Sequence, residues 1–80
     1  MLAQDEIGQG KQGKPLTSRE VELIALVARA YSDKAIAREK GISLQTVKNL
    51  LQSARYKLNL HTRVELTLWY ISITKESNNV

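Results

Sequence analysis

The sequence from Ser43 to Leu58 is SLQTVKNLLQSARYKL, and it predicts a helix with two different faces. At about 100° per residue, apolar side chains gather on one arc and long polar side chains on the opposite arc. The polar arc suits a negatively charged partner with hydrogen-bonding edges, because the segment holds no acidic residue. We therefore predict that this helix enters the major groove of DNA. The apolar arc, expected to face a core, comprises Val47, Leu50, Leu51, Ala54 and Leu58, and the polar arc comprises Gln45, Lys48, Asn49, Gln52 and Tyr56.

A shorter helix is expected just before this one. Ser32 can cap its start, and Gly41 can end it because glycine adopts a left-handed conformation without steric cost. Ser43 then caps the long helix, so that only about three residues separate the two helices. Two helices joined by a short turn with glycine, the second of them basic, are typical of a helix-turn-helix, which we place at about residues 32–51.

A first helix is expected ahead of the helix-turn-helix. Thr17 and Glu20 have the spacing of a capping box, and apolar spacing continues the helix to about residue 29 or 30. Residues 1–14 contain three glycines and no apolar periodicity, so they are expected to be a flexible tail or linker. The predicted fold class is all-α, with a four-helix domain over residues 15–75 and a frayed C-terminus over residues 76–80.

The last expected helix is apolar on more than one side. It follows a second capping box, formed by Thr62 and Glu65, and covers about residues 63–73 or 63–74. One apolar face can be buried in the core, and a second face would stay exposed in a monomer, which predicts self-association. The alternative is that so small a domain buries its last helix more deeply. The predicted dimer face comprises Val64, Thr67, Leu68 and Ile71.

Positive charge is concentrated in the middle of the chain. The net charge is +4, but the segment from Lys34 to Arg63 holds seven basic residues and only one acidic residue, Glu39. A basic middle favours a polyanionic partner, although a solvated basic surface would give the same pattern.

Composition and length exclude several classes of protein. Eighty residues form one domain at most, and the absence of cysteine excludes a disulfide framework, a thiolate zinc site and a cysteine nucleophile. No apolar run approaches the roughly 18 residues of a membrane helix, so no membrane partner is expected. No paired carboxylates, nucleophile with a base, or glycine-rich phosphate loop is present, so neither an enzyme nor a cofactor is expected. A cytoplasmic location is expected.

Several short motifs occur in a characteristic order and resemble a known family. They are LTSRE at 16–20, YSDKAIA at 31–37, ISLQTVKN at 42–49, KL at 57–58 and TR at 62–63. Together they resemble the LuxR-type DNA-binding domain found in LuxR, FixJ, NarL and GerE proteins, over about residues 16–70. The resemblance implies a bacterial transcription regulator that binds DNA as a homodimer on inverted half-sites. Its third helix would contact the bases, and its fourth would form the dimer.

The resemblance also implies roles for individual residues. Lys48, Asn49 and Gln52 match the base-reading positions of the family. A lysine ammonium can donate to O6 and N7 of guanine, and side-chain amides can pair with N6 and N7 of adenine. Phosphate contacts are expected from positions matched in the family and from basic residues nearby. These residues are Lys34, Arg38, Thr46, Arg55, Lys57 and Arg63.

The chain departs from the family pattern at four positions. The family often has Gly where this chain has Ala30 and Asn59, Glu where it has Ala35, and His where it has Leu50. Ala30 and Asn59 are expected to alter helix ends, and no departure removes a groove contact. The operator therefore need not follow a family consensus.

Two other functions compete with this interpretation. Residues 53–58 after a helix-turn-helix also resemble a sigma-factor region, which would recognise a promoter while bound to RNA polymerase and would not form a homodimer. A helix-turn-helix that has lost DNA binding and binds a regulator protein is the third hypothesis. The expected partners are double-stranded DNA and a second copy of the chain. RNA polymerase and an N-terminal sensor or receiver domain outside this chain are further candidates.

Overall fold

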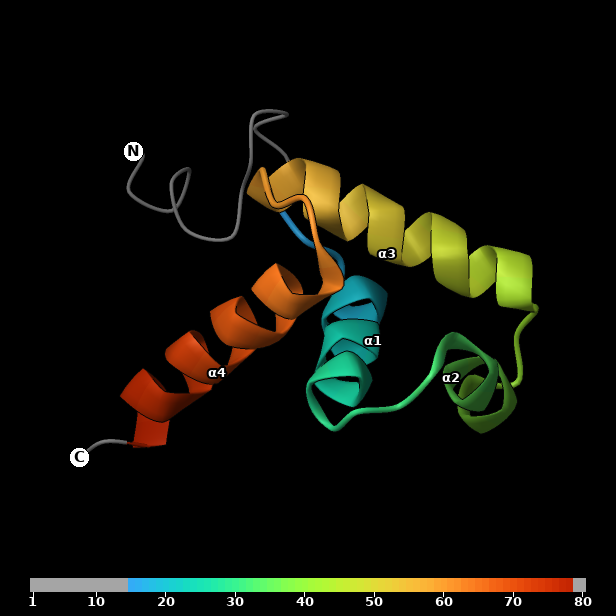
Figure 1. Cartoon of the computed structure of the whole chain (residues 1–80), viewed down its shortest axis with the longest axis horizontal. Coiled ribbons are helices and arrows are strands. Elements are labelled where there is room, and N and C mark those ends of the chain that lie inside the picture. The colour runs from blue at the N-terminus through green and yellow to red at the C-terminus, as the bar shows by residue number, and fades with distance from the viewer. Residues whose placement is uncertain (1–14, 79–80) are drawn as a thin grey trace.

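Four α-helices follow one another in the computed structural model, which describes residues 15–78. They are α1 (Ser18–Ala28), α2 (Asp33–Lys40), α3 (Leu44–Leu58) and α4 (Arg63–Asn78). Figure 1 shows α1 between α3 and α4, with α2 beside the start of α3. The predicted all-α fold and the predicted helix-turn-helix of α2 and α3 are confirmed.

The predicted caps set the start of each helix. A side-chain hydroxyl accepts a hydrogen bond from the backbone N–H three residues later, which satisfies an otherwise unpaired donor of the first turn. In the first capping box, the N–H of Thr17 also donates to Oε1 of Glu20 at 2.8 Å. The capping bonds run from Glu20 to Thr17 (3.1 Å), Ala35 to Ser32 (3.1 Å), Thr46 to Ser43 (3.0 Å) and Glu65 to Thr62 (3.1 Å).

Three helices end at residues in the left-handed conformation. Gly41 has φ of 68° after α2, while Ala30 and Asn59 have φ of 70° and 59° after α1 and α3. After α1, the N–H of Tyr31 donates to the carbonyl of Leu26 at 3.1 Å, which completes a Schellman motif. Ala30 and Asn59 are the two positions at which the family that the sequence resembles often has Gly. Glycine fits this conformation best, because only glycine adopts it without strain.

The core lies between α1 and the other three helices. Leu23 and Ile24 of α1 are fully buried, as are Ile36 of α2, Val47 of α3 and Leu66 of α4. α1 contacts all three other helices, and α2 also packs against α3. Leu50 and Leu58, which were expected in the core, are half-buried and packed against it, as are Trp69 and Tyr70 of α4.

α4 is longer than its sequence predicted. The predicted end at Ile73 or Thr74 is wrong, because the helix continues to Asn78. Residues 76–78 were expected to fray but are helical, and neither glycine nor proline interrupts them. The predicted tail at residues 1–14 and the last two residues lie outside the described residues.

Candidate nucleic-acid interface

The polar arc of α3 is exposed along its length, as the sequence predicted. Lys48, Asn49 and Gln52, the predicted base-reading residues, are all exposed, and so are Gln45 and Tyr56. The opposite arc holds the helix in place, because its members Val47, Leu51 and Ala54 are buried in the core. α3 therefore presents a continuous polar face without an acidic side chain.

Three hydrogen bonds order side chains at the start of α3. The Nε2 of Gln45 donates to Oδ1 of Asn49 at 3.0 Å, so these two residues of the exposed face are linked. The hydroxyls of Ser43 and Thr46 lie 2.8 Å apart, while the N–H of Thr46 donates to Ser43. Thr46, predicted to contact phosphate, is half-buried at this end of the helix.

An open hollow of about 420 Å³ lies where α2, α3 and α4 begin. It brings together three predicted contact residues from three helices, namely Lys34, Lys48 and Arg63. Ser32, Asp33 and Leu44 form the rest of its lining. Three basic groups and a single acid give the hollow a net positive charge, which suits an anionic group such as a phosphate.

Arg63 has internal partners as well as access to this hollow. Its Nη1 lies 2.7 Å from Oδ1 of Asp33, and its Nη2 donates to the carbonyl of Tyr31 at 2.6 Å. These bonds connect the start of α4 to the start of α2. The side chain keeps 41% of its surface exposed, so the guanidinium remains accessible although Asp33 offsets part of its charge.

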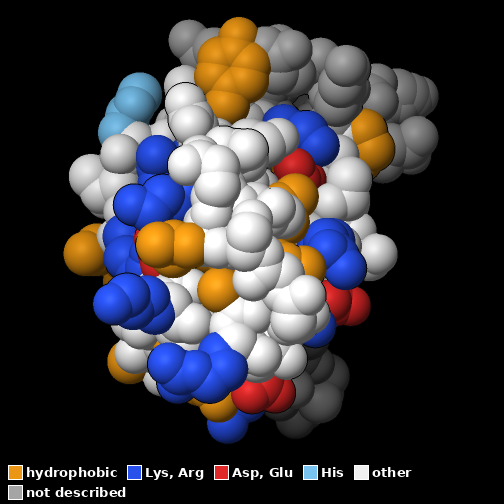
Figure 2. Space-filling model, turned by 90° about the vertical axis from the view of Figure 1, so that its right-hand side faces the viewer, with side chains coloured by type: hydrophobic (Ala, Val, Ile, Leu, Met, Phe, Trp, Pro, Cys, Tyr) orange, Lys and Arg blue, Asp and Glu red, His pale blue; other side chains and the backbone are white. Residues whose placement is uncertain are grey.

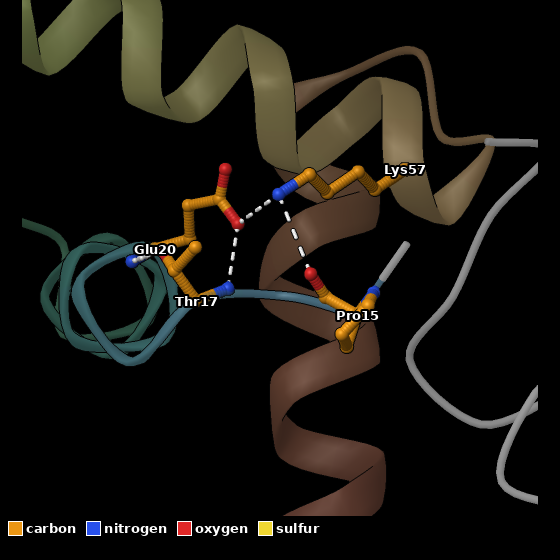
Figure 3. Close-up of polar contacts among 4 residues, drawn as sticks. All are labelled: Pro15, Thr17, Glu20 and Lys57. Atoms are coloured by element: carbon orange, nitrogen blue, oxygen red, sulfur yellow. Dashed lines mark hydrogen bonds and ion pairs between the residues drawn. The ribbon is translucent and has the colours of Figure 1, made fainter. Parts of the chain in front are cut away.

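Lys57 lies in a different environment from the other predicted phosphate contacts. Its ammonium is 3.0 Å from Oε1 of Glu20 and 3.4 Å from the carbonyl of Pro15, as Figure 3 shows. The side chain of Lys57 is 14% exposed, and that of Glu20 is 3% exposed. The structure therefore does not bring Lys57 to the exposed face, because its ammonium neutralises a buried carboxylate between α1 and α3.

The same contacts determine the pKa of Glu20. Burial by itself raises the pKa of this carboxyl, since it disfavours the charged form. The hydrogen bond from the Thr17 N–H and the interaction with Lys57 outweigh burial, so the pKa lies below its usual value. Glu20 is thus a buried carboxylate that stays charged while it caps α1.

The remaining basic residues differ in whether they form an ion pair with a carboxylate. Lys40 pairs with Glu22 at 2.9 Å, so its charge is locally compensated. Among residues 15–75, whose side chains the structure describes, no carboxylate forms an ion pair with Lys34, Arg38, Lys48 or Arg55. Lys34, Arg38 and Lys48 are exposed, and Arg55 is half-buried. Figure 2 shows Lys and Arg side chains gathered in a column along the left edge of the face that it presents.

Two residues of this region were not assigned a role from the sequence. Gln45 was placed on the polar arc, but its spacing of four residues from Asn49 was the signal for a side-chain bond. Asp33 gave no comparable signal, because its partner Arg63 lies 30 residues further along the chain.

Two other kinds of feature are absent from the described residues. No helix within residues 15–78 is long and apolar enough to cross a membrane. Residues 15–75, whose side chains are described, contain no group of three His, Asp or Glu side chains that could hold a metal ion.

Comparisons with known proteins agree with the helix-turn-helix. The chain is 42% identical over 55 residues to the HTH-type transcriptional activator RamA of Corynebacterium glutamicum, covering 69% of this chain and 20% of RamA. It is 33% identical over 54 residues to the response regulator protein VraR of Staphylococcus aureus, covering 68% of this chain and 26% of VraR. No solved structure gave a significant match.

The chain thus spans about a fifth to a quarter of the length of these relatives. Its residues 14–70 match the GerE family model, described as bacterial regulatory proteins of the luxR family. This match covers all of α1, α2 and α3 and half of α4. The chain belongs to the LuxR family of bacterial regulatory proteins.

Proposed function

We propose that this domain binds double-stranded DNA sequence-specifically, with α3 in the major groove, as part of a transcription regulator. Membership of the LuxR family supports DNA-binding transcription regulation. The observation that carries the proposal is the polar face of α3, which is exposed and lacks acids while the opposite face is buried. A helix held in this way can enter a groove without disturbing the core.

The proposed contacts fall into two groups. Lys48, Asn49 and Gln52 contact base edges, because they lie on the exposed face of α3. Residues around them contact phosphates and supply affinity without sequence preference. This second group comprises Lys34, Thr46 and Arg63 near the hollow, with Arg38 and Arg55. Lys57 is assigned to the core pair with Glu20 instead.

A second copy of the chain is the proposed partner of α4. Val64, Leu68 and Ile71 are 65%, 59% and 45% exposed, and their spacing of four and three residues places them on one side of the helix. Thr67, also predicted for this face, is half-buried. Packing α4 against α4 of a second copy would bury these side chains and create a two-fold axis. A two-fold dimer binds inverted half-sites.

Selection of bound sequences from a random duplex pool tests this function directly. The 80-residue chain is expected to select an inverted repeat. A salt series on the selected duplex and on a random duplex then separates the two groups of contacts. Lys48→Ala should weaken the selected duplex more than the random one, by about 1–3 kcal/mol. Lys34→Ala should weaken both alike and reduce the salt slope by about 0.9.

Lys75→Ala is the matched control, because Lys75 is an exposed lysine in the last turn of α4. Figure 1 shows the C-terminal end of α4 pointing away from α2 and α3. This substitution should change neither binding nor the salt slope. Equal losses on both duplexes for Lys48→Ala would contradict its role in base reading. Failure to bind any duplex at low salt would favour the protein-interaction module. A monomer at high concentration by sedimentation would favour the sigma-like function.

The whole regulator is proposed to be longer than this domain. The chain covers 20% of RamA and 26% of VraR, and VraR is named a response regulator protein. We propose that a sensor or receiver domain N-terminal to this domain controls it, and that RNA polymerase is a further partner. A regulator of bacterial transcription would act in the cytoplasm.

A further inference from the structure

The hydrogen bond between Gln45 and Asn49 lies within the proposed reading face. Gln45 donates through Nε2 to Oδ1 of Asn49 at 3.0 Å, and both side chains are exposed. They are four residues apart on α3, where side chains on one face of a helix meet. One of these residues is a proposed base reader, and the other has no assigned function.

This bond decides what the amide of Asn49 offers to a partner. A side-chain amide has a carbonyl oxygen that accepts and an amino group that donates two hydrogen bonds. Because the carbonyl oxygen of Asn49 is turned toward Gln45, the amino group of Asn49 is left to face a partner. The neighbouring Lys48 can only donate, through its ammonium. Two adjacent readers therefore present donors.

We propose that Gln45 is a positioning residue for base reading, which fixes the amide of Asn49 with its amino group toward the groove. This inference rests on the proposed DNA-binding function. Guanine presents two acceptors in the major groove, O6 and N7, whereas adenine presents one donor and one acceptor. Asn49 fixed in this way favours guanine, rather than the adenine that an unrestrained asparagine amide would pair with.

Substitution of Gln45 separates positioning from direct reading. Gln45 and Asn49 lie about 6 Å apart along the axis of α3, at 1.5 Å per residue. Because the two amides meet at 3.0 Å, Gln45 can reach the same base pair as Asn49. Affinities alone therefore do not separate the two roles, and the mobility of the Asn49 amino group in the free protein is measured as well. The base pair that Asn49 contacts is identified first, as the pair whose preference disappears in Asn49→Ala. Affinities of the 80-residue chain are then measured for duplexes with each of the four bases at that pair.

Two variants of Gln45 have different expected results. Gln45→Ala releases the amide of Asn49, so the preference for guanine at that pair should fall by about two- to tenfold, the cost of ordering one side chain. Gln45→Glu places a carboxylate there, which can only accept, so the amino group of Asn49 turns toward it. The oxygen of Asn49 then faces the groove, and the preference should move to bases that donate, cytosine or adenine.

Gln52→Ala is the matched control, because Gln52 is an exposed glutamine on the same face of α3. It should relax a different base pair and leave the preference at the Asn49 pair intact. The midpoint of thermal unfolding should be the same for wild type and all variants, because each substituted side chain is exposed. In the free protein, NMR relaxation of the Asn49 amino group should show faster motion in Gln45→Ala than in wild type.

Three results would overturn the inference while leaving the proposed function intact. The first is an unchanged preference at the Asn49 pair in both Gln45 variants, and the second is a change confined to a neighbouring pair. The third is equal mobility of the Asn49 amino group in wild type and Gln45→Ala. If the wild-type chain selects no sequence, the proposed function fails and the inference falls with it.

Discussion

Ala30 is the residue whose identity fits its conformation least well. It has φ of 70° at the end of α1, where an L-residue brings its Cβ close to the following carbonyl. Gly41, after α2, has almost the same conformation, with φ of 68° and no Cβ. The strain at Ala30 is offset by the hydrogen bond from the N–H of Tyr31 to the carbonyl of Leu26, which fixes the turn between α1 and α2.

Replacing Ala30 with glycine should therefore stabilise the domain. Ala30→Gly removes the Cβ from a left-handed position and should raise the free energy of unfolding by about 1 kcal/mol. Chemical denaturation monitored by circular dichroism measures this change. Ala25→Gly, the same substitution in the middle of α1, should instead lower stability by about 1 kcal/mol. A loss of stability in Ala30→Gly would contradict the strain argument.

The ion pair of Lys57 with Glu20 gives a second prediction about single residues. Lys57→Met leaves a buried carboxylate without its cation and should lower the free energy of unfolding by about 1–3 kcal/mol. Replacing both residues, in Glu20→Leu with Lys57→Met, should recover part of this loss, because no charge is then buried alone. A double-mutant cycle of unfolding free energies measures the coupling.

DNA binding distinguishes this role from the phosphate contact that the sequence suggested for Lys57. At a temperature where the variant is folded, Lys57→Met should keep the salt slope of the wild type. A slope reduced by about 0.9 would show that Lys57 neutralises a phosphate after all.

The surroundings of a side chain were predictable only where the signal was local in sequence. The exposure of Lys48, Asn49 and Gln52, the proposed reading residues, follows from helical spacing in one segment, and all three are exposed as expected. The partner of Lys57 lies 37 residues away, so neither spacing nor charge could reveal it. A basic residue near the end of α3 gives the same sequence signal whether it contacts a phosphate or a buried acid.

At the scale of elements, helix starts were more predictable than helix ends. Each start depends on a hydroxyl and the N–H three residues later, and the four predicted caps are confirmed. The predicted end of α4 lies about four residues too early. Apolar periodicity is lost near Thr74, but no glycine or proline follows to stop the helix. Ala30 and Asn59 were expected to alter helix ends, but both adopt the left-handed conformation typical of glycine at a helix end.

α4 carries the prediction about self-association. Leu68→Lys places a charge in the centre of the exposed apolar face and should convert a dimer to a monomer without unfolding α4. Sedimentation equilibrium over a range of concentrations, without DNA, measures this. Tyr56→Lys is the control, since Tyr56 is 58% exposed, close to the 59% of Leu68, but lies on α3. The same dissociation in both variants would argue against a specific α4 interface.

For the molecule as a whole, lowered carboxyl pKa values predict loss of stability in acid. Backbone hydrogen bonds from His61 and Thr62 lower the pKa of Glu65, and contacts with Thr17 and Lys57 lower that of Glu20 despite its burial. Because both values are lower in the folded state, their contribution is complete above the unfolded value near 4.5. It is lost as the pH falls through the folded pKa values.

Thermal unfolding from pH 7 downward tests this dependence. The midpoint of the wild type should change little from neutral pH to about pH 5 and then fall. Glu20→Gln should start lower and fall less steeply in acid, because the titrating carboxylate is absent. Glu39→Gln is the control, since Glu39 is exposed and makes no ion pair with a described residue. An equal acid slope in Glu20→Gln and wild type would contradict the assignment.

The central position of α1 has a consequence for the geometry of binding sites. α1 packs against both the helix proposed to read DNA and the helix proposed to join two copies. In a dimer joined through α4, the distance between the two α3 helices would therefore include the thickness of α1 in each copy. Leu23 and Ile24, which contact neither DNA nor partner in this arrangement, would help to hold that separation, because both are fully buried between these helices.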